Sequence, residues 1–292
     1  MASKIDILDI REFERDQELS DFYCNKFEDH LQTHKKAITV PHKHNFFLTV
    51  IFTRGSGIHE IDFEKYEVLP GSVFMLNPGQ THYWELSDDI EGMILFHSKE
   101  FFDVCFTNQS VFDFPFFYSV HNPSALFLEP AQTAHLADNF QNILQEYMHR
   151  HTLSRQKIVS LLNCIYIDLS RIYLHSGHNK LLKPGKYAGY LRKLEELIEE
   201  QFKKEKSAAT YAERLNITKR HLNRLTQQML GKSTTQLITE RVILEAKRLI
   251  VYDASSLATI SHELGYEDYT YFSRLFKKWT GLTPSEFGKS YG

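Results

Sequence analysis

Residues 207–229 read Ser207-Ala-Ala-Thr-Tyr-Ala-Glu-Arg-Leu-Asn-Ile-Thr218 and then Lys219-Arg-His-Leu-Asn-Arg-Leu-Thr-Gln-Gln-Met229. The pattern recurs further along the chain as Ser256-Leu-Ala-Thr-Ile-Ser-His-Glu-Leu-Gly-Tyr266 and Asp268-Tyr-Thr-Tyr-Phe-Ser-Arg-Leu-Phe-Lys-Lys-Trp279. Each stretch predicts a short helix, a turn and a longer basic helix. This is the helix-turn-helix arrangement, which places its second helix in the major groove of DNA. The sequence therefore predicts two such units in tandem.

The longer helix of each unit has one apolar and one polar face. The apolar side chains at helical spacing are Ile217, Leu222, Leu225 and Met229 in the first unit, and Phe272, Phe276 and Trp279 in the second. The polar side chains follow the i, i+3, i+4, i+7 pattern of one helix face. They are Arg220, Asn223, Arg224 and Gln227, and then Thr270, Ser273, Arg274 and Lys277. Thr218 and Asp268 are predicted to cap the first turns of these helices.

A single helix is predicted between the two units, from Thr235 to Tyr252. Its apolar stripe contains no Gly or Pro that would break it. Such a connector would hold the two reading helices at a fixed separation, with Arg224 and Arg274 in equivalent positions. Their helices would enter successive major-groove faces about 34 Å apart. We therefore expect one monomer to bind a half-site in two parts.

This C-terminal segment resembles the DNA-binding domain of the AraC/XylS family of bacterial transcription regulators. The matching segments are Tyr211–Leu225, Gly231-Lys232, Arg241 with Ala246–Leu249, and Leu264–Phe287. The resemblance implies base contacts from Arg220, Asn223 and Arg224, and from Tyr269, Thr270, Ser273 and Arg274. Lys219, Gln227 and Lys277 complete the predicted DNA-binding set. The chain departs from the family pattern at Thr226, Ser261 and Gly288, which affects packing details and one backbone contact.

Charge divides the chain in the same way. From Lys183 to the end there are 19 Lys and Arg against 13 Asp and Glu residues, a net charge of +6, whereas residues 1–182 carry 15 against 24, a net of −9. A basic domain is the electrostatic footprint expected for binding to phosphates. The acidic half argues against a second nucleic-acid surface there.

Length and composition limit the remaining classes. The chain has 292 residues, 42% of them hydrophobic, which is enough for two domains with their own cores. No apolar run approaches the ~20 residues that span a bilayer, and residues 1–6 lack a signal-peptide core. We therefore expect a soluble, cytoplasmic protein with no membrane partner. Cys24, Cys105 and Cys164 form no Cys-x-x-Cys pair, so we expect three buried thiols and neither disulfides nor a zinc site.

The N-terminal half predicts short strands separated by turns. The strands expected are Phe46–Arg54, Gly57–Phe63, Ser72–Leu76, His82–Leu86 and Glu91–His97. The segments Pro41-His-Lys-His44 and Pro78-Gly-Gln-Thr-His82 resemble the small cupin barrel that forms the sensor half of many AraC-type regulators. A barrel of this size can enclose one small ligand. The resemblance therefore implies a small-molecule effector.

Three histidines of this barrel, His42, His44 and His82, are the candidate effector-pocket residues. Cupin enzymes hold a metal at such positions and add a Glu shortly after the His-x-His pair, but here Asn45–Val50 contains no carboxylate. Three neutral imidazoles would still suffice for a tetrahedral site with an open position. The alternative that we favour is hydrogen bonding at the barrel mouth, with no metal, no cofactor and no enzymatic activity. Phe112–Tyr118 is either a pocket wall or, as we favour, core packing.

Two amphipathic helices are predicted after Pro130. The first covers Gln132–His149 and the second Ser154–His175, each with an apolar stripe that must be buried. One alternative is that both stripes pack only on their own barrel. The other, which the family resemblance also implies, is that part of the pair forms a homodimer interface.

The predicted fold class is α+β with two domains. The predicted boundaries are 1–130 for a cupin-like antiparallel barrel, 131–175 for helical dimerisation, 176–185 for a linker and 186–292 for an all-α domain with two helix-turn-helix units joined by a long helix. The function expected is sequence-specific DNA binding by a transcription regulator under effector control, with RNA polymerase as a candidate partner. A metal-dependent cupin enzyme and an architectural protein without sequence preference are the competing hypotheses.

Overall fold

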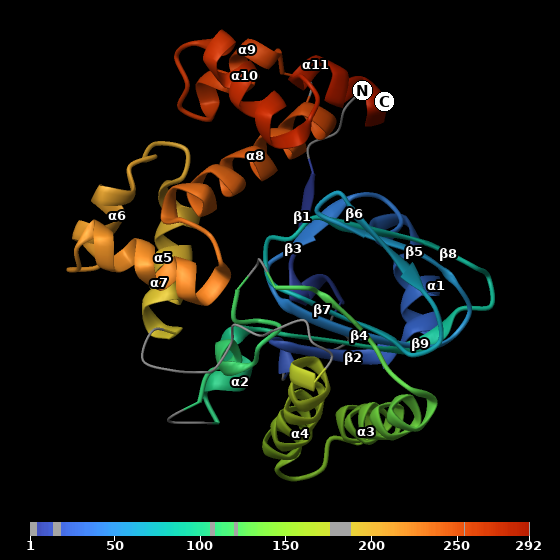
Figure 1. Cartoon of the computed structure of the whole chain (residues 1–292). Helices are drawn as coiled ribbons and strands as arrows, with labels where there is room; N and C mark the ends of the chain where they lie inside the picture. Colours follow the sequence, from blue (N-terminus) through green and yellow to red (C-terminus); the bar gives the residue numbers. More distant parts are fainter. Residues whose placement is uncertain are drawn as a thin grey trace. The chain divides into compact units, whose positions relative to one another are not determined.

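The structure of the protein is a computed structural model that describes residues 5–13, 19–105, 109–119, 122–175, 188–253 and 255–291. The chain divides into two units, Ile5–Lys180 and Leu181–Gly292 with Met1–Lys4. The first is rich in strands and the second is helical (Figure 1). The linker predicted at 176–185 lies outside the described residues.

Two five-stranded sheets build the N-terminal barrel. The first sheet has the order β1 (Asp6–Leu8), β3 (His42–His44), β8 (His82–Leu86), β5 (Gly57–Ile61), β6 (Glu64–Val68). The second has the order β10 (Ala125–Phe127), β7 (Ser72–Leu76), β4 (Phe47–Arg54), β9 (Glu91–His97), β2 (Phe22–Lys26). The strand pairs are antiparallel except β1 with β3. The antiparallel barrel predicted from the sequence is confirmed.

Strand β4 is buried on both faces. Leu48, Val50 and Phe52 point into the barrel, whereas Phe47 and Ile51 belong to a second core outside it. Because successive side chains of a strand point to opposite faces, β4 is apolar at every position from Phe47 to Phe52 except Thr49. A second layer must therefore cover the outer face of its sheet.

Helices α3 (Pro130–His149) and α4 (Ser154–His175) supply that layer (Figure 1). The apolar stripe predicted on α3 is buried. The apolar stripe predicted on α4 is also buried, except that Leu161 and Ile172 are half-buried. Both stripes pack in the core between the helices and the second sheet. Helix α3 begins two residues earlier than predicted, because Pro130 fits the first helical turn, where its missing N–H is not needed.

The aromatic stretch Phe112–Tyr118 lies in this outer core. Phe114, Phe116 and Phe117 contact the ring of Tyr166 on α4. The stretch begins in η3 (Val111–Asp113) and follows α2 (Lys99–Asp103). Its role is therefore core packing outside the barrel, as we favoured from the sequence.

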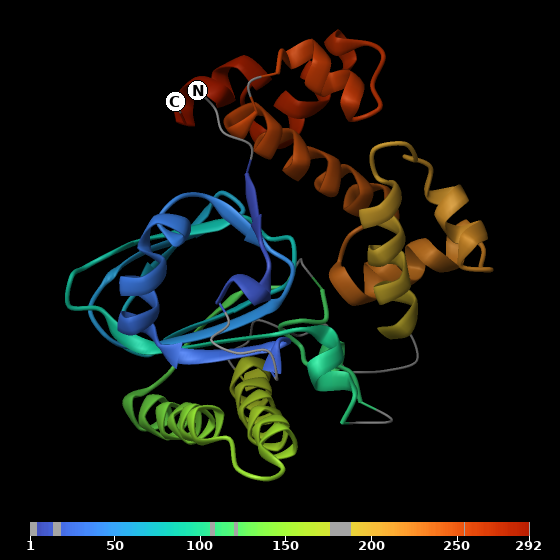
Figure 2. The ribbon, with the colours of Figure 1, turned by 180° about the vertical axis from the view of Figure 1, so that it is seen from behind.

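The remaining parts of the barrel include elements that the sequence did not predict. Helix α1 (Phe27–Ile38) lies across one end of the barrel (Figure 2), and Phe27 and Ile38 join the interior core together with Phe13 of η1 (Ile10–Phe13). Strand β5 ends earlier than predicted, because Asp62 and Phe63 adopt left-handed conformations (φ 49° and 72°) that turn the chain into β6.

Two of the three cysteine predictions are wrong. Cys24 is buried in the outer core as expected, but Cys105 and Cys164 are exposed. Cys105 follows the short helix α2 at the surface, and Cys164 lies on the outward side of α4. No disulfide is formed between described cysteines.

The C-terminal unit contains seven described helices. They are α5 (Ala188–Gln201), α6 (Ala208–Arg214), α7 (Lys219–Leu230), α8 (Thr234–Tyr252), α9 (Leu257–Glu263), α10 (Tyr269–Thr280) and α11 (Pro284–Tyr291). The two helix-turn-helix units are α6–α7 and α9–α10, and α8 is the unbroken connector. All three predictions are confirmed. Among the described residues, none of the helices is both long and apolar enough to cross a membrane.

Candidate DNA-binding faces and barrel interior

Helix α7 begins where the sequence predicts. The Thr218 hydroxyl accepts a hydrogen bond from the His221 backbone N–H at 3.1 Å, and α7 ends at Gly231 in a left-handed conformation (φ 66°). Such a cap satisfies one of the free N–H groups of the first turn. The first turn of α7, from which Lys219 and Arg220 project, is therefore ordered.

All five DNA-binding residues predicted on α7 are exposed on one side of the helix. They are Lys219, Arg220, Asn223, Arg224 and Gln227. The opposite side carries Leu222, Leu225 and Met229 in the core. The helix therefore separates its apolar and polar residues as the spacing predicted.

The cations on this face differ from others in the same unit. Within the described residues, Arg220 and Arg224 have no ion-pair partner, whereas Arg241 pairs with Glu199 at 2.6 Å and Lys232 with Glu240 at 2.9 Å. Arg241 and Lys232 are thus neutralised inside the unit, whereas Arg220 and Arg224 face the solvent. Unpaired guanidinium groups on an exposed helix are suited to phosphates and guanine edges.

Asn223 has a structural contact in addition to its exposure. Its Oδ1 accepts a hydrogen bond from the Thr234 backbone N–H at 3.2 Å, at the start of α8. The Thr226 hydroxyl donates to the Asn223 carbonyl at 3.1 Å and lies 3.3 Å from the Thr234 hydroxyl. Thr226, which departs from the family pattern, therefore helps to join α7 to α8.

Helix α10 repeats the arrangement. Its N-cap Asp268 accepts from the Thr270 N–H at 2.7 Å, and Phe272 and Phe276 are buried. Thr270, Arg274 and Lys277 are exposed, and Tyr269 and Ser273 are half-buried. The predicted residues of α10 therefore lie along one side of the helix.

The sequence analysis missed one residue of this helix. Tyr271 is 58% exposed and lies one turn before Arg274. Its place outside the buried stripe of Phe272 and Phe276 was the available signal. A tyrosine exposed beside a cation extends the polar face with an aromatic group.

The barrel interior brings the three predicted histidines together. His42 and His82 are cross-strand partners of β3 and β8, with ring centroids 4.3 Å apart, and the His44 and His82 centroids are 5.1 Å apart. All three are at most 3% exposed. They are buried among aromatic side chains of the barrel, with His44 against Phe46 and His82 against Trp84.

A fourth histidine, His59 of β5, completes what we call the histidine cluster (His42, His44, His59 and His82). Its Nε2 lies 3.0 Å from Nδ1 of His82, so one ring donates to the other. His59 occupies an inward position on the strand next to β8. The sequence analysis did not include His59 among the candidate residues.

Several polar atoms of this region have no hydrogen-bonding partner among the described residues. They are His44 Nε2, His59 Nδ1, His82 Nε2 and Trp84 Nε1. Because a backbone carbonyl only accepts, His44 Nδ1 donates to the Phe46 oxygen at 2.7 Å and the neutral ring keeps Nε2 as an acceptor. The indole N–H of Trp84 is a donor only. An unsatisfied buried polar group costs about 1–3 kcal/mol, a cost that a hydrogen-bonding ligand at these atoms would offset.

The cluster is uncharged at neutral pH. Burial lowers the pKa of His44 to about 3 and holds the pKa values of His59 and His82 well below the ordinary range, and the neighbouring imidazoles lower them further. Burial likewise lowers the pKa of His42. In the described parts of the chain, no three His, Cys, Asp or Glu side chains are arranged to hold a metal ion. The cluster therefore offers neutral hydrogen-bonding groups.

Comparison with known proteins gives matches to both halves. Residues 28–162 match the family described as AraC-like ligand binding domain, and residues 211–290 match a helix-turn-helix domain family. The arabinose operon regulatory protein of Salmonella typhimurium is 23% identical over 239 residues, which cover 80% of each chain. The HTH-type transcriptional activator RhaR of Yersinia pseudotuberculosis is 23% identical over 253 residues, covering 86% of this chain and 85% of RhaR. The structure of ToxT from Vibrio cholerae aligns with 92% of this chain and 98% of its own, at 13% identity and a TM-score of 0.43.

Proposed function

Because the chain belongs to the AraC-type transcription regulators, we propose that it binds DNA through the exposed polar faces of α7 and α10 and senses a small molecule with its histidine cluster. It is a transcription regulator with an N-terminal ligand-binding domain and a C-terminal DNA-binding domain, and not an enzyme. A bacterial transcription regulator must have access to chromosomal DNA, which lies in the cytoplasm. We therefore propose a cytoplasmic location.

The observation that carries the DNA-binding proposal is the pair of equivalent exposed faces. Arg224 and Arg274 occupy the same position in α7 and α10, and both are exposed without an ion-pair partner in the described residues. One bidentate contact between an arginine and a guanine is worth about 1–3 kcal/mol of discrimination. Two such helices, held by α8, would read a site in two blocks.

The test is capture of fragments of the source genome on purified protein, followed by sequencing. Wild type should enrich a motif with two blocks about one helical turn apart, and the Arg224→Ala, Arg274→Ala double variant should lose it. A matched control, Lys193→Ala with Lys204→Ala, removes two exposed cations away from the reading helices. Recovery of the same unpatterned fragments by wild type and the double variant would support the architectural hypothesis in place of ours.

The histidine cluster supports an effector that carries hydroxyl groups. The unsatisfied atoms include an acceptor, His44 Nε2, and a donor, Trp84 Nε1, and a hydroxyl both donates and accepts. The imidazoles are neutral, so they provide no charge to attract an anion. One relative is the regulatory protein of an arabinose operon. We propose a sugar or a similar uncharged polyol as the effector class.

A thermal-shift panel of pentoses, hexoses, amino acids and fatty acids tests this assignment. A ligand that binds the folded state raises Tm by mass action. We expect a sugar to raise the Tm of wild type and of His149→Phe, an exposed position on α3, but not of His44→Phe. A ligand that shifts all three proteins equally would place the effector site outside the histidine cluster.

We also propose a homodimer formed through the outward side of α4. That side carries the exposed residues Cys164 and Leu174 and the half-buried Ile167, whereas the apolar stripe of α4 packs on the barrel. Mild oxidation should cross-link two copies through Cys164 and should still do so in Cys105→Ser. A monomer in solution at micromolar concentration would contradict this interface.

RNA polymerase is the further partner that we propose, at the promoter. Co-purification of polymerase with the protein on its recovered DNA site tests this. Equal recovery on DNA without the protein would exclude the contact.

A further inference from the structure

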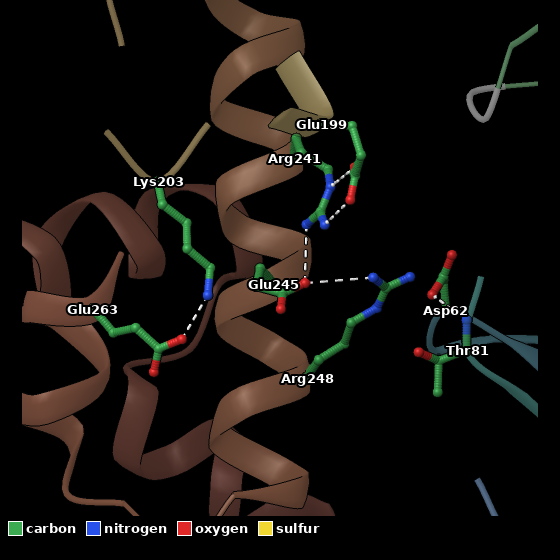
Figure 3. Close-up of polar contacts among 8 residues, drawn as sticks. All are labelled: Asp62, Thr81, Glu199, Lys203, Arg241, Glu245, Arg248 and Glu263. Carbon is green, nitrogen blue, oxygen red and sulfur yellow. Dashed lines mark hydrogen bonds and ion pairs between the residues drawn. The ribbon is translucent and has the colours of Figure 1, made fainter. Parts of the chain in front are cut away.

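The segment after α5 contacts the second helix-turn-helix unit directly. Lys203 Nζ pairs with Glu263 Oε1 on α9 at 2.5 Å (Figure 3). Lys206 Nζ donates to the carbonyls of Phe202 at 2.5 Å, Lys203 at 2.8 Å and Leu264 at 2.9 Å. The ammonium group therefore uses all three donors on carbonyls just beyond the ends of α5 and α9, and it lies over the Tyr266 ring at 5.3 Å from the centroid.

Gly265 shows how closely the two segments approach. It adopts a left-handed conformation (φ 82°), and a Cβ at this position would lie 2.0 Å from the Lys203 carbonyl oxygen. The first unit offers an internal comparison, because Asn216 occupies the equivalent turn with φ 53° and carries a side chain. The left-handed turn alone thus accepts asparagine. At position 265 the close contact with Lys203 leaves no room for a Cβ, so this turn requires glycine.

A second contact braces α5 against the connector α8. Arg241 makes two parallel hydrogen bonds to Glu199, at 2.6 and 2.8 Å, and its guanidinium stacks 3.9 Å from the Phe202 ring centroid. Arg241 also pairs with Glu245 on its own helix at 3.0 Å (Figure 3). Bidentate pairs of this kind fix orientation as well as distance. Helix α5 is therefore held at α8 and, beyond its end, at α9.

We infer that these contacts, which we call the Lys206 latch (Lys203, Lys206, Glu263 and Gly265), fix the separation and rotation of α7 and α10, so that one monomer accepts only one spacing between the two DNA blocks. The connector α8 is one attachment between the two helix-turn-helix units, and it resists bending and twisting between them. The latch adds a second, independent attachment that opposes both. This inference rests on the proposed function, which supplies the two-block site.

The expected consequence is strict dependence on spacing. Inserting one base pair between two blocks moves one of them by about 3.4 Å and rotates it by about 36°. Two rigidly joined helices cannot follow that movement without losing contacts of one helix. A protein with a loose joint follows it at small cost.

The test uses the duplex that wild type selects from a random library, together with versions lengthened or shortened by one base pair. We expect wild type to lose at least tenfold in affinity on either change. Lys206→Met keeps the aliphatic stem but removes the three donors, and it should bind the native spacing more weakly and show less than threefold loss on the altered duplexes. The control Lys204→Met removes the same charge from an exposed neighbour and should keep the wild-type profile.

A charge exchange distinguishes a latch from general loss of folding. Lys203→Glu and Glu263→Lys should each flatten the spacing profile, and the double exchange should restore it. Spacing profiles parallel to wild type in Lys206→Met and in both single exchanges would overturn the inference. If wild type selects no two-block site, the proposed function fails. The existence of the latch is then tested by a second measurement that needs no DNA.

That second measurement is the distance between spin labels at Gln228 on α7 and Lys278 on α10, both exposed. The labels are attached in a background in which the three native cysteines are replaced. Wild type should give a narrow distance distribution, and Lys206→Met and Gly265→Ala should broaden it. Equal widths in the three proteins would overturn the latch irrespective of any DNA result.

Discussion

At the scale of single residues, buried polar side chains make specific contacts that the pattern of apolar residues does not predict. Tyr166 on α4 is fully buried, and its hydroxyl lies 2.7 Å from His97 Nε2 and 3.2 Å from the Thr49 hydroxyl. His97 Nδ1 donates to the Ser98 carbonyl, so Nε2 of the neutral ring accepts from Tyr166. This network ties α4 to the sheet beneath it.

Tyr166→Phe should lower the free energy of unfolding of the barrel by about 1–3 kcal/mol, because it leaves buried polar atoms without partners. Trp84 and Trp279 are the two tryptophans, one in each unit, so urea unfolding followed by Trp84 fluorescence in a Trp279→Phe background reports on the barrel alone. The matched control is Tyr66→Phe, whose hydroxyl bonds to Glu64 at the surface. An effect of Tyr166→Phe no larger than the control's would refute the role of the network.

The histidine cluster makes barrel stability depend on pH. Because the folded-state pKa of His44 is lowered to about 3, the unfolded chain binds more protons between that value and the ordinary pKa of about 6.5. The barrel is therefore destabilised as pH falls through this window, by about 1.4 kcal/mol per pH unit for such a histidine. His44→Phe should reduce the slope between pH 6 and 5 by about that amount. His149→Phe should keep the wild-type slope, and equal slopes in all three proteins would contradict the prediction.

At the scale of helices and strands, the sequence predicted best those elements whose ends are marked by capping residues. Helices α7 and α10 were predicted to within a residue of their starts, because Thr218 and Asp268 are caps and the stripes behind them are regular. Strands β1 and β10 were missed since each has only three residues, too few to show alternation. His59 was missed for a related reason, because its neighbours on β5 include Gly57 and the charged Glu60 rather than alternating apolar residues.

The caps themselves carry a prediction. Thr218→Ala should lower the stability of the C-terminal unit by about 1 kcal/mol, because the first turn of α7 loses an acceptor for its free N–H groups. Urea unfolding followed by Trp279 fluorescence in a Trp84→Phe background measures this, and Thr218→Ser, which keeps the hydroxyl, is the control. A loss as large in the serine variant would show that the methyl group and not the cap is responsible.

At the scale of the whole molecule, net charge is divided along the chain: residues 1–182 carry −9, and the remaining residues carry +6. The sequence alone predicted this division, and the structure adds which cations remain available. Lys206, Lys203 and Arg241 are engaged inside the unit, so the charge that meets DNA is smaller than the formal total. Under the proposed function, the exposed cations of α7 and α10 supply it.

Phosphate and base contacts should separate in a salt titration of DNA binding. Each phosphate contact contributes about −0.9 to the slope of log K against log salt. Lys219→Ala at the start of α7 should reduce the slope by about that amount, and should weaken specific and non-specific duplexes alike. Arg274→Ala should cost about 1–3 kcal/mol on the specific duplex and leave much of the non-specific, salt-dependent affinity. If Arg274→Ala weakened both duplexes equally, Arg274 would be a phosphate contact, and base reading on α10 would have to come from Thr270 and Ser273.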